Sequence, residues 1–501
     1  MISLLPSSLP PLPLLLWETP PGLELILRQE GVAFARVRDP HPLVFQRGRF
    51  VLYDGRRVSL SKVRAMLSPD HVALDIDGLR QGERIDPFEA IVDTRAVLTT
   101  WSVDGYALTE RVARHDKARI RRGLLHRLRQ AVAQAGGVWA RLAAYPFPYR
   151  SALNFRVDLD ETNLEDYARF ARARRPLADC CTHFVSTHAY GEHPEVLRDL
   201  LRFDTQSHGH YHVIYRDPEL NRRNLERAHR VLEESGFDPV GFAAPHGRWN
   251  AGLDVAIERL GYLFSSDFQL GYDDLPFFPW RDGRFSNVLQ VPIHPICEGL
   301  FLEAGASQGA TIARHLVQVT RAKIEAGEPA FVYGHPEGRL ARFPEILAAL
   351  ASEVADRPLL WRVSLSEFAR WWRWRNEREW SLVPRGEGRY EVQFDDWDSA
   401  YPLGLEIHRG AHVSTIPVRS SRMALRLDDL AYERQDIRVD PPAPIPAPRK
   451  RGLRSVVRQA IDWETVTPID ELPSDSLSAR VKKGLRRWRQ GPTRGREEAP
   501  K

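Results

Sequence analysis

The stretch Phe155-Arg-Val-Asp-Leu-Asp-Glu161 joins an apolar, strand-like run to a cluster of acids. Carboxylates that follow a parallel strand lie at the sheet edge where α/β proteins form their active sites. Because side chains alternate along a strand, Asp158 and Asp160 share a face and can reach one site. The alternative role is helix capping, since Asp160 or Thr162 could begin a helix around Leu164–Phe170.

Short apolar runs alternate with amphipathic stretches from about residue 150 to residue 374. This alternation predicts an α/β fold with a parallel sheet or barrel. The predicted strands are Leu153–Val157, Cys181–Ser186, Val240–Ala243, Tyr262–Ser265, Leu289–Ile293 and Ala330–Tyr333, and the main helices are Asn221–Ser235 and Ala251–Leu260.

The regions on either side have different patterns. Residues 1–145 contain strand-like runs and the helical stretch His115–Gln134, which predicts a small N-terminal α/β domain that ends at the prolines of Tyr145–Tyr149. Residues 380–434 show turn-separated alternation, which predicts a small β domain. Residues 441–501 are predicted to be a stiff proline-rich linker followed by basic amphipathic segments.

Composition and charge narrow the class of protein. The chain has 501 residues, of which 43% are hydrophobic and 27% charged, as in a globular protein of two or more domains. Arg449–Lys501 holds 14 Lys/Arg and 7 Asp/Glu, so residues 1–448 hold 71 − 14 = 57 basic and 66 − 7 = 59 acidic residues, a net charge of −2. A near-neutral body argues against nucleic acid as a partner, because neutralising phosphates needs a basic face.

Cellular location is predicted from the cysteines and the two ends. Three cysteines, two of them adjacent, form no disulfide framework and indicate a reducing compartment. Leu9–Trp17 is apolar but lacks a basic leader and contains prolines, so it predicts neither a signal peptide nor a membrane span. We expect a cytoplasmic protein. Its basic tail is predicted to bind the anionic inner surface of the membrane. The alternatives are that it binds an acidic protein partner or remains solvated without a partner.

The histidine-rich motif Ser207-His-Gly-His-Tyr-His212 carries the strongest chemical signal. His208 and His212 are four residues apart, so on a helical turn both imidazoles point the same way and could share one metal ion. The alternative is a surface loop that is rich in histidine by chance, because the chain contains 17 histidines.

The acid-bearing strand followed about fifty residues later by Ser-His-x-x-x-His resembles the NodB-type polysaccharide deacetylases, the family-four carbohydrate esterases. Phe242–Asn250 is similar to the third motif of this family and Tyr262–Asp267 to the fourth. His294 and His335 each offer the strand-end histidine of the fifth motif. The resemblance covers about residues 150–370 and implies a distorted (β/α) barrel.

The resemblance also implies an activity, the metal-dependent hydrolysis of an N-acyl group, N-acetyl first, from a sugar or glycoconjugate. The implied ligands of a divalent metal ion, zinc first, are Asp160, His208 and His212. Asp158 would be the general base. His335 is the first choice for the acid that protonates the leaving amine, and His294 is the second.

The sequence departs from the family pattern at several positions. Leu159 separates two acids that are adjacent in the family, so a pairing of Asp160 with Glu161 stays open. Ala243 stands where the family has an arginine that orients the base.

Two nearby arginines are candidates to replace it, and Arg248 is a better one than Arg156. His246 replaces an aromatic residue and could be a ligand or a pocket wall. Because the third-motif arginine is missing, a related hydrolase of other non-peptide C–N bonds on small amides stays open. A non-catalytic glycan-binding module on the same fold is a further alternative, against which the intact pair His208 and His212 argues.

Overall fold

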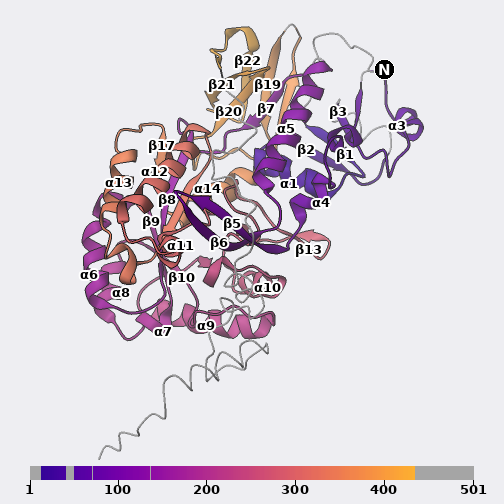
Figure 1. The fold of residues 1–501 in the computed structure, drawn as a ribbon. Helices are drawn as coiled ribbons and strands as arrows, with labels where there is room; N and C mark the ends of the chain where they lie inside the picture. Colours follow the sequence, from indigo (N-terminus) through magenta and orange to yellow (C-terminus); the bar gives the residue numbers. More distant parts are fainter. Residues whose placement is uncertain (1–12, 41–49, 70, 136, 387, 435–501) are drawn as a thin grey trace, which may run out of the picture.

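The computed structural model is shown in Figure 1, and it describes residues 13–40, 50–69, 71–135, 137–386 and 388–434. The predicted linker and basic tail, residues 441–501, lie outside the described residues. Within the described ranges, no helix combines the length and apolar character needed to cross a membrane.

A barrel-like sheet of eight parallel strands forms the centre of the molecule. The strand order is β15-β12-β11-β10-β9-β8-β16, with β17 paired to the start of β8. Across the seam between β15 and β16, the backbone N–H of His294 donates to the carbonyl of Phe331 at 2.8 Å. The predicted α/β class with a distorted (β/α) barrel is therefore confirmed. The strands are β8 (Ser151–Leu159), β9 (Cys181–Val185), β10 (Asp204–Ser207), β11 (Gly241–Ala243), β12 (Phe264–Ser266), β15 (Leu289–Gln290), β16 (Ala330–Gly334) and β17 (Leu360–Arg362).

Strand β10 lies in the middle of this sheet and is not among the predicted strands. Its sequence, Asp-Thr-Gln-Ser, is polar, but its buried side chains find partners. The Gln206 side-chain oxygen accepts hydrogen bonds from the backbone N–H groups of Val240 and Gly241 at 2.8 and 2.7 Å. A search for apolar runs misses such a strand, because hydrogen bonds compensate for the burial of its polar groups.

Helices surround the barrel strands, and a short hairpin extends from them. The helices are α6 (Leu164–Ala173), α7 (Thr187–Tyr190), α8 (Pro194–Leu200), α9 (Pro218–Glu234), α10 (Ala251–Arg259), α11 (Glu298–Glu303), α12 (Gly309–Glu325), α13 (Glu345–Val354) and α14 (Leu365–Asn376). The hairpin consists of β13 (Trp280–Arg281) and β14 (Arg284–Phe285).

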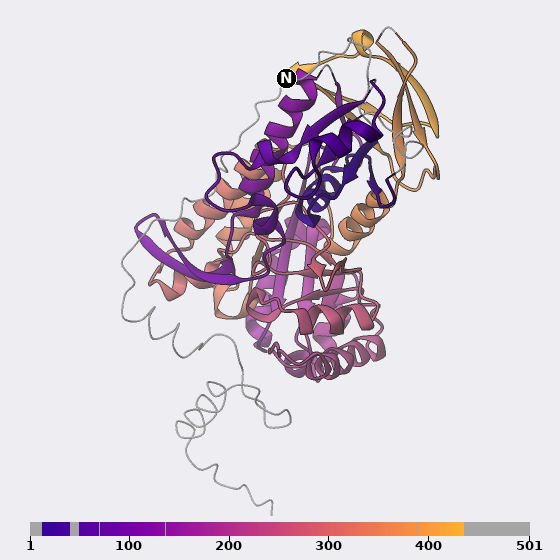
Figure 2. The ribbon, with the colours of Figure 1, turned by 90° about the vertical axis from the view of Figure 1, so that its right-hand side faces the viewer.

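The N-terminal region contains a four-stranded parallel sheet of order β2-β1-β3-β4. Its elements are β1 (Leu14–Trp17), α1 (Pro21–Glu30), β2 (Phe34–Val37), β3 (Phe50–Tyr53), α3 (Leu60–Met66), β4 (Val72–Asp75), α4 (Pro87–Val92) and α5 (Lys117–Gln134). A long hairpin, β5 (Ala96–Val103) and β6 (Tyr106–Ala113), reaches from this region to the barrel (Figures 1 and 2). There the backbone N–H of Ala113 donates to the carbonyl of Phe268 at 3.1 Å.

Antiparallel strands make up the C-terminal region. One sheet has the order β18-β19-β22 and the other the order β23-β21-β20-β7. Strand β7 (Trp139–Leu142) precedes the barrel in the chain, so segments from before and after the barrel share a sheet. The remaining strands are β18 (Trp380–Pro384), β19 (Arg389–Phe394), β20 (Gly404–Arg409), β21 (His412–Pro417), β22 (Arg422–Arg426) and β23 (Glu433–Arg434).

A buried group of ion pairs, here named the central ion network, joins these three regions. Its members are Glu30, Arg121, Arg141, Asp274, Glu328 and Glu406. Arg121 on α5 pairs with Glu30 on α1 and, at 2.8 Å, with Asp274 of the barrel. Arg141 on β7 pairs with Glu30 and, at 2.7 Å, with Glu406 on β20. Each acid of the network therefore faces at least one guanidinium group.

Candidate metal centre

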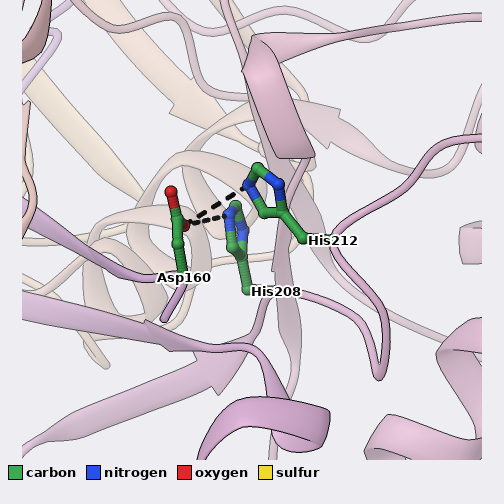
Figure 3. Close-up of side chains that lie close together, drawn as sticks. All are labelled: Asp160, His208 and His212. Carbon is green, nitrogen blue, oxygen red and sulfur yellow. Dashed lines mark ion pairs between the residues drawn. The ribbon is translucent and has the colours of Figure 1, made fainter. Parts of the chain in front are cut away.

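Three side chains at the C-terminal ends of the barrel strands converge on one point (Figure 3). The Nε2 atoms of His208 and His212 lie 3.1 and 3.4 Å from the same Asp160 oxygen, Oδ1. One ligand atom from each of the three residues lies within 4.8 Å of the other two. These three residues are named the candidate metal centre below.

Asp160 is positioned by the end of β8. The helix that follows is capped by Asn163, whose side-chain oxygen accepts a hydrogen bond from the backbone N–H of Asp166 at 3.1 Å. Capping by Asp160 or Thr162 is therefore not needed, and the Asp160 carboxylate is available to face the two imidazoles.

His208 and His212 lie in the loop after β10, so the predicted helical turn is wrong. The loop reverses at Gly209, whose φ of +86° falls in the left-handed region that favours glycine. Asn224 on α9 clamps the loop, since it accepts from the backbone N–H of Tyr211 at 2.9 Å and donates to the Tyr211 carbonyl at 3.0 Å. A clamped loop thus brings together the two imidazoles, whose spacing suggested a helix.

The donor set fits a cation. Nδ1 of His208 lies 2.8 Å from the carbonyl of Ala243, so the ring carries its proton on Nδ1 and its Nε2 lone pair faces Asp160. Oδ1 of Asp160 is buried and accepts no hydrogen bond within the described part of the chain. The Nε2 lone pair of His208 and the Asp160 oxygen repel one another unless positive charge lies between them, and two imidazoles with a carboxylate are a zinc-type ligand set.

The ionisation of Asp160 agrees with this arrangement. Burial alone would raise the pKa of the Asp160 carboxyl, but positive charge on the neighbouring imidazoles of His212 and His335 holds that pKa well below its usual value. The Asp160 carboxyl is therefore ionised, as a metal ligand must be.

Asp158 is held by a neighbour on its own strand. Arg156 donates from Nε to Oδ1 at 2.6 Å and from Nη2 to Oδ2 at 2.5 Å, and both residues are almost fully buried. Burial opposes ionisation, but Arg156 outweighs it and lowers the pKa of Asp158. The preference for Arg248 is wrong, because the Arg248 guanidinium lies 3.5 Å from the carbonyl of Ile214. Strand alternation at 156 and 158 was the signal that could have identified Arg156.

His335 approaches the other oxygen of Asp160, with 3.7 Å between its Nε2 and Oδ2. Glu298, at the start of α11, fixes the ring: its Oε1 lies 2.7 Å from Nδ1 and accepts from the backbone N–H of His335 at 2.8 Å. Burial and Arg339 lower the pKa of His335, but Glu298 and Asp160 outweigh them and raise it well above its usual value. The sequence contained no periodic signal for Glu298.

Other predicted candidates lie elsewhere. His294, the second choice for the acid, has both ring nitrogens engaged: Nδ1 with Asp273 at 2.9 Å and Nε2 with His315 at 3.2 Å. It is part of another buried cluster. Glu161 is exposed and does not join Asp160 in the group. The ring of His246 packs edge-on against that of His212, with 4.7 Å between ring centroids, as a wall residue would.

Comparison with known proteins gives fold-level similarity only. No protein-family model matches the chain, and no curated protein matches it. A protein from Mycobacterium smegmatis assigned as a polysaccharide deacetylase is 21% identical, with 48% of this chain and 95% of that chain covered and a TM-score of 0.40. The Puue allantoinase is 20% identical, with 46% and 93% covered and a TM-score of 0.40.

A third solved structure, a family 4 acetyl xylan esterase from Clostridium thermocellum in complex with a cobalt ion, is 12% identical. It covers 44% of this chain and 91% of its own, with a TM-score of 0.32. The solved structures thus include the family that the ordered motifs resemble. At these identities the similarity concerns the fold and assigns no activity.

Proposed function

We propose that this chain is a divalent-metal-dependent hydrolase that removes an N-acyl group, N-acetyl first, from a sugar or glycoconjugate. The observation that supports this most directly is the convergence of Asp160, His208 and His212, in which both imidazoles face an unsatisfied carboxylate oxygen. The order of motifs along the barrel points to the same chemistry.

The proposed ligands are the three residues of the candidate metal centre, and zinc is the first choice because nitrogen and oxygen donors suit it. When bound, such an ion polarises an amide carbonyl and lowers the pKa of a coordinated water. Three protein ligands leave coordination positions open for water and substrate.

Asp158 accepts the proton of the attacking water. Its carboxylate is ionised at neutral pH and cannot rotate, because Arg156 holds both oxygens. The guanidinium is fixed in turn by a 2.8 Å hydrogen bond to the carbonyl of Ser266. A base held in one orientation loses little entropy when the reaction occurs.

His335 donates a proton from Nε2 to the leaving amine. Glu298 binds Nδ1, so the imidazole presents Nε2 toward Asp160 and the substrate space beside it. The negative charge of Glu298 keeps the ring protonated before the C–N bond breaks. The base thus lies on β8, and the acid directly follows β16.

The test combines metal analysis with a substrate panel. Purified protein is dialysed, its metal content is measured by mass spectrometry, and hydrolysis is followed for N-acetylated sugars and for cyclic and linear small amides. We expect about one divalent ion per chain and turnover of the acetylated sugars, abolished by a chelator. If only the small amides are hydrolysed, the protein is a hydrolase of small amides and not of acetylated sugars. If metal is bound but no substrate is hydrolysed, the protein is a non-catalytic binding module.

A further inference from the structure

A cavity of about 610 Å³ lies between α5, β7 and the C-terminal strands. Figure 1 shows α5 beside β7 and β20 in this part of the molecule. None of its lining residues belongs to the candidate metal centre. The polar and aromatic side chains that line it are His126, Arg129, Trp139, Tyr390, His408 and Arg409.

Arg129 lacks an anionic partner in this cavity. Within the described residues its guanidinium makes no hydrogen bond and no ion pair, and its Nε is buried without an acceptor. Its guanidinium lies over the ring of Trp139, 5.7 Å from the centroid. Glu30 and Glu406 attract it from beyond ion-pair distance. The nearby Arg141, by contrast, is neutralised by Glu30 and Glu406. A buried guanidinium without an anion is costly, so a ligand that brings one is favoured.

Electrostatics agree with the geometry. Burial first, and then repulsion by Arg141, outweighs the attraction of Glu30 and Glu406 and lowers the pKa of Arg129 to about 10. Burial and the charge of Arg129 lower the pKa of His408 to about 4, so this imidazole is neutral. The second guanidinium at the cavity, Arg409, is paired with Asp428 at 3.3 Å. Among the described residues that line the cavity, Arg129 is therefore the guanidinium that makes no ion pair.

Uncharged hydrogen-bonding groups complete the site. The indole Nε1 of Trp139, a residue only 3% exposed, has no acceptor within the described part of the chain. Nε2 of His408 is buried without a hydrogen bond and lies 3.4 Å from a Glu406 oxygen. These groups and Tyr390 suit the hydroxyl groups of a ligand, and the volume is within the range of small-molecule sites, about 300–1,000 Å³.

We propose that this cavity binds a sugar acid of the uronate class, with its carboxylate on Arg129 and its hydroxyl groups toward Trp139, His408 and Tyr390. A carboxylate matches the single uncompensated charge, whereas a phosphate dianion would leave negative charge beside Asp428. The site is separate from the candidate metal centre and does not depend on the proposed hydrolysis.

Titration calorimetry with the full chain tests the proposal, with glucuronate as the probe and glucose and glucose 1-phosphate as comparisons. We expect saturable binding of glucuronate, no binding of glucose, and weaker binding of the phosphate. Arg129→Gln should weaken glucuronate binding roughly tenfold or more, because a charge-assisted hydrogen bond is lost. Arg127→Gln is the matched control on the same helix, since Arg127 pairs with Glu83 outside the cavity.

Two further variants keep the test decisive. Arg129→Gln should melt at or above the wild-type temperature, because it removes an uncompensated buried charge, and Arg129→Lys should retain part of the affinity. Binding should survive His208→Ala, which separates this site from the candidate metal centre. Absence of glucuronate binding, equal affinity in Arg129→Gln, tighter binding of glucose 1-phosphate, or loss of binding in His208→Ala would each overturn the proposal.

Discussion

The candidate metal centre and the central ion network are both buried clusters of acids and nitrogen bases, but their hydrogen bonding differs. In the network, Glu30 and Glu406 each face a guanidinium, and Arg121 pairs with three acids. In the metal centre, Asp160 faces two imidazoles and keeps an unsatisfied oxygen. Compensated charges join parts of the fold, and uncompensated ones mark a place for a ligand.

Removing a ligand of the candidate metal centre should have the largest effect. We expect Asp160→Ala or His208→Ala to lose bound metal and about 1,000-fold in hydrolysis, because the ion supplies several kcal/mol of transition-state stabilisation. Metal content and initial rates are measured together. His193→Ala is the control, since this histidine lies outside the candidate metal centre and its side chain pairs with Glu195 at 3.4 Å. Full metal and activity in His208→Ala would refute the assignment.

Glu30→Gln should instead damage stability and leave metal content unchanged. Burial would raise the pKa of Glu30, but Arg141 and Arg121 lower it to about 2 from 4.5. This carboxylate therefore contributes on the order of 3 kcal/mol above pH 4.5, and the contribution is lost as the pH falls toward 2.

Equilibrium unfolding in denaturant at pH 7 and at pH 3 measures the contribution of Glu30 to stability. The difference in unfolding free energy between wild type and Glu30→Gln should shrink at the lower pH. The exposed pair of Glu83 and Arg127 supplies the control, and Glu83→Gln should change stability by less than about 1 kcal/mol. A difference that is equal at both pH values would contradict the role given to Glu30.

His335 and His294 sharpen the comparison, because each histidine belongs to a different buried cluster. His335→Asn should lower kcat about 100-fold with metal retained, as expected for the loss of a general acid. His294→Asn should keep kcat and lower the melting temperature, since its ring bridges Asp273 and His315. Steady-state kinetics and thermal unfolding measure both effects. If the His294 variant loses kcat and the His335 variant only loses stability, His294 and not His335 is the general acid.

Deletion of residues 441–501 should have the smallest effect on both clusters. The tail has a net charge of +7 and the rest of the chain a net charge of −2, so its loss should leave hydrolysis unchanged and lower co-sedimentation with anionic vesicles. Unchanged sedimentation would contradict membrane binding by the tail. It would favour the alternatives that the tail binds an acidic protein partner or is solvated without a partner.

Much of the fold could be predicted, because short-range periodicity follows from backbone geometry. All six predicted barrel strands overlap observed ones, and α9 and α10 begin or end within a few residues of their predicted bounds. Strand β10 was missed because its burial depends on hydrogen bonds to residues more than 30 positions away. The loop of His208 and His212 was assigned as a helical turn, because Asn224 acts from another element.

The sequence by itself determined the acid-bearing strand, its alternation and the order of the histidine motif, since these depend on neighbours in the chain. Only the tertiary structure decided which strand-end histidine meets Asp160, that Arg156 holds Asp158, and that Glu298 holds His335. The same is true of the cavity around Arg129, which is lined by segments that lie about 250 residues apart in the chain, before and after the barrel. Such contacts depend on how the sheets assemble, and the periodicity of a single element carries no information about distances between elements.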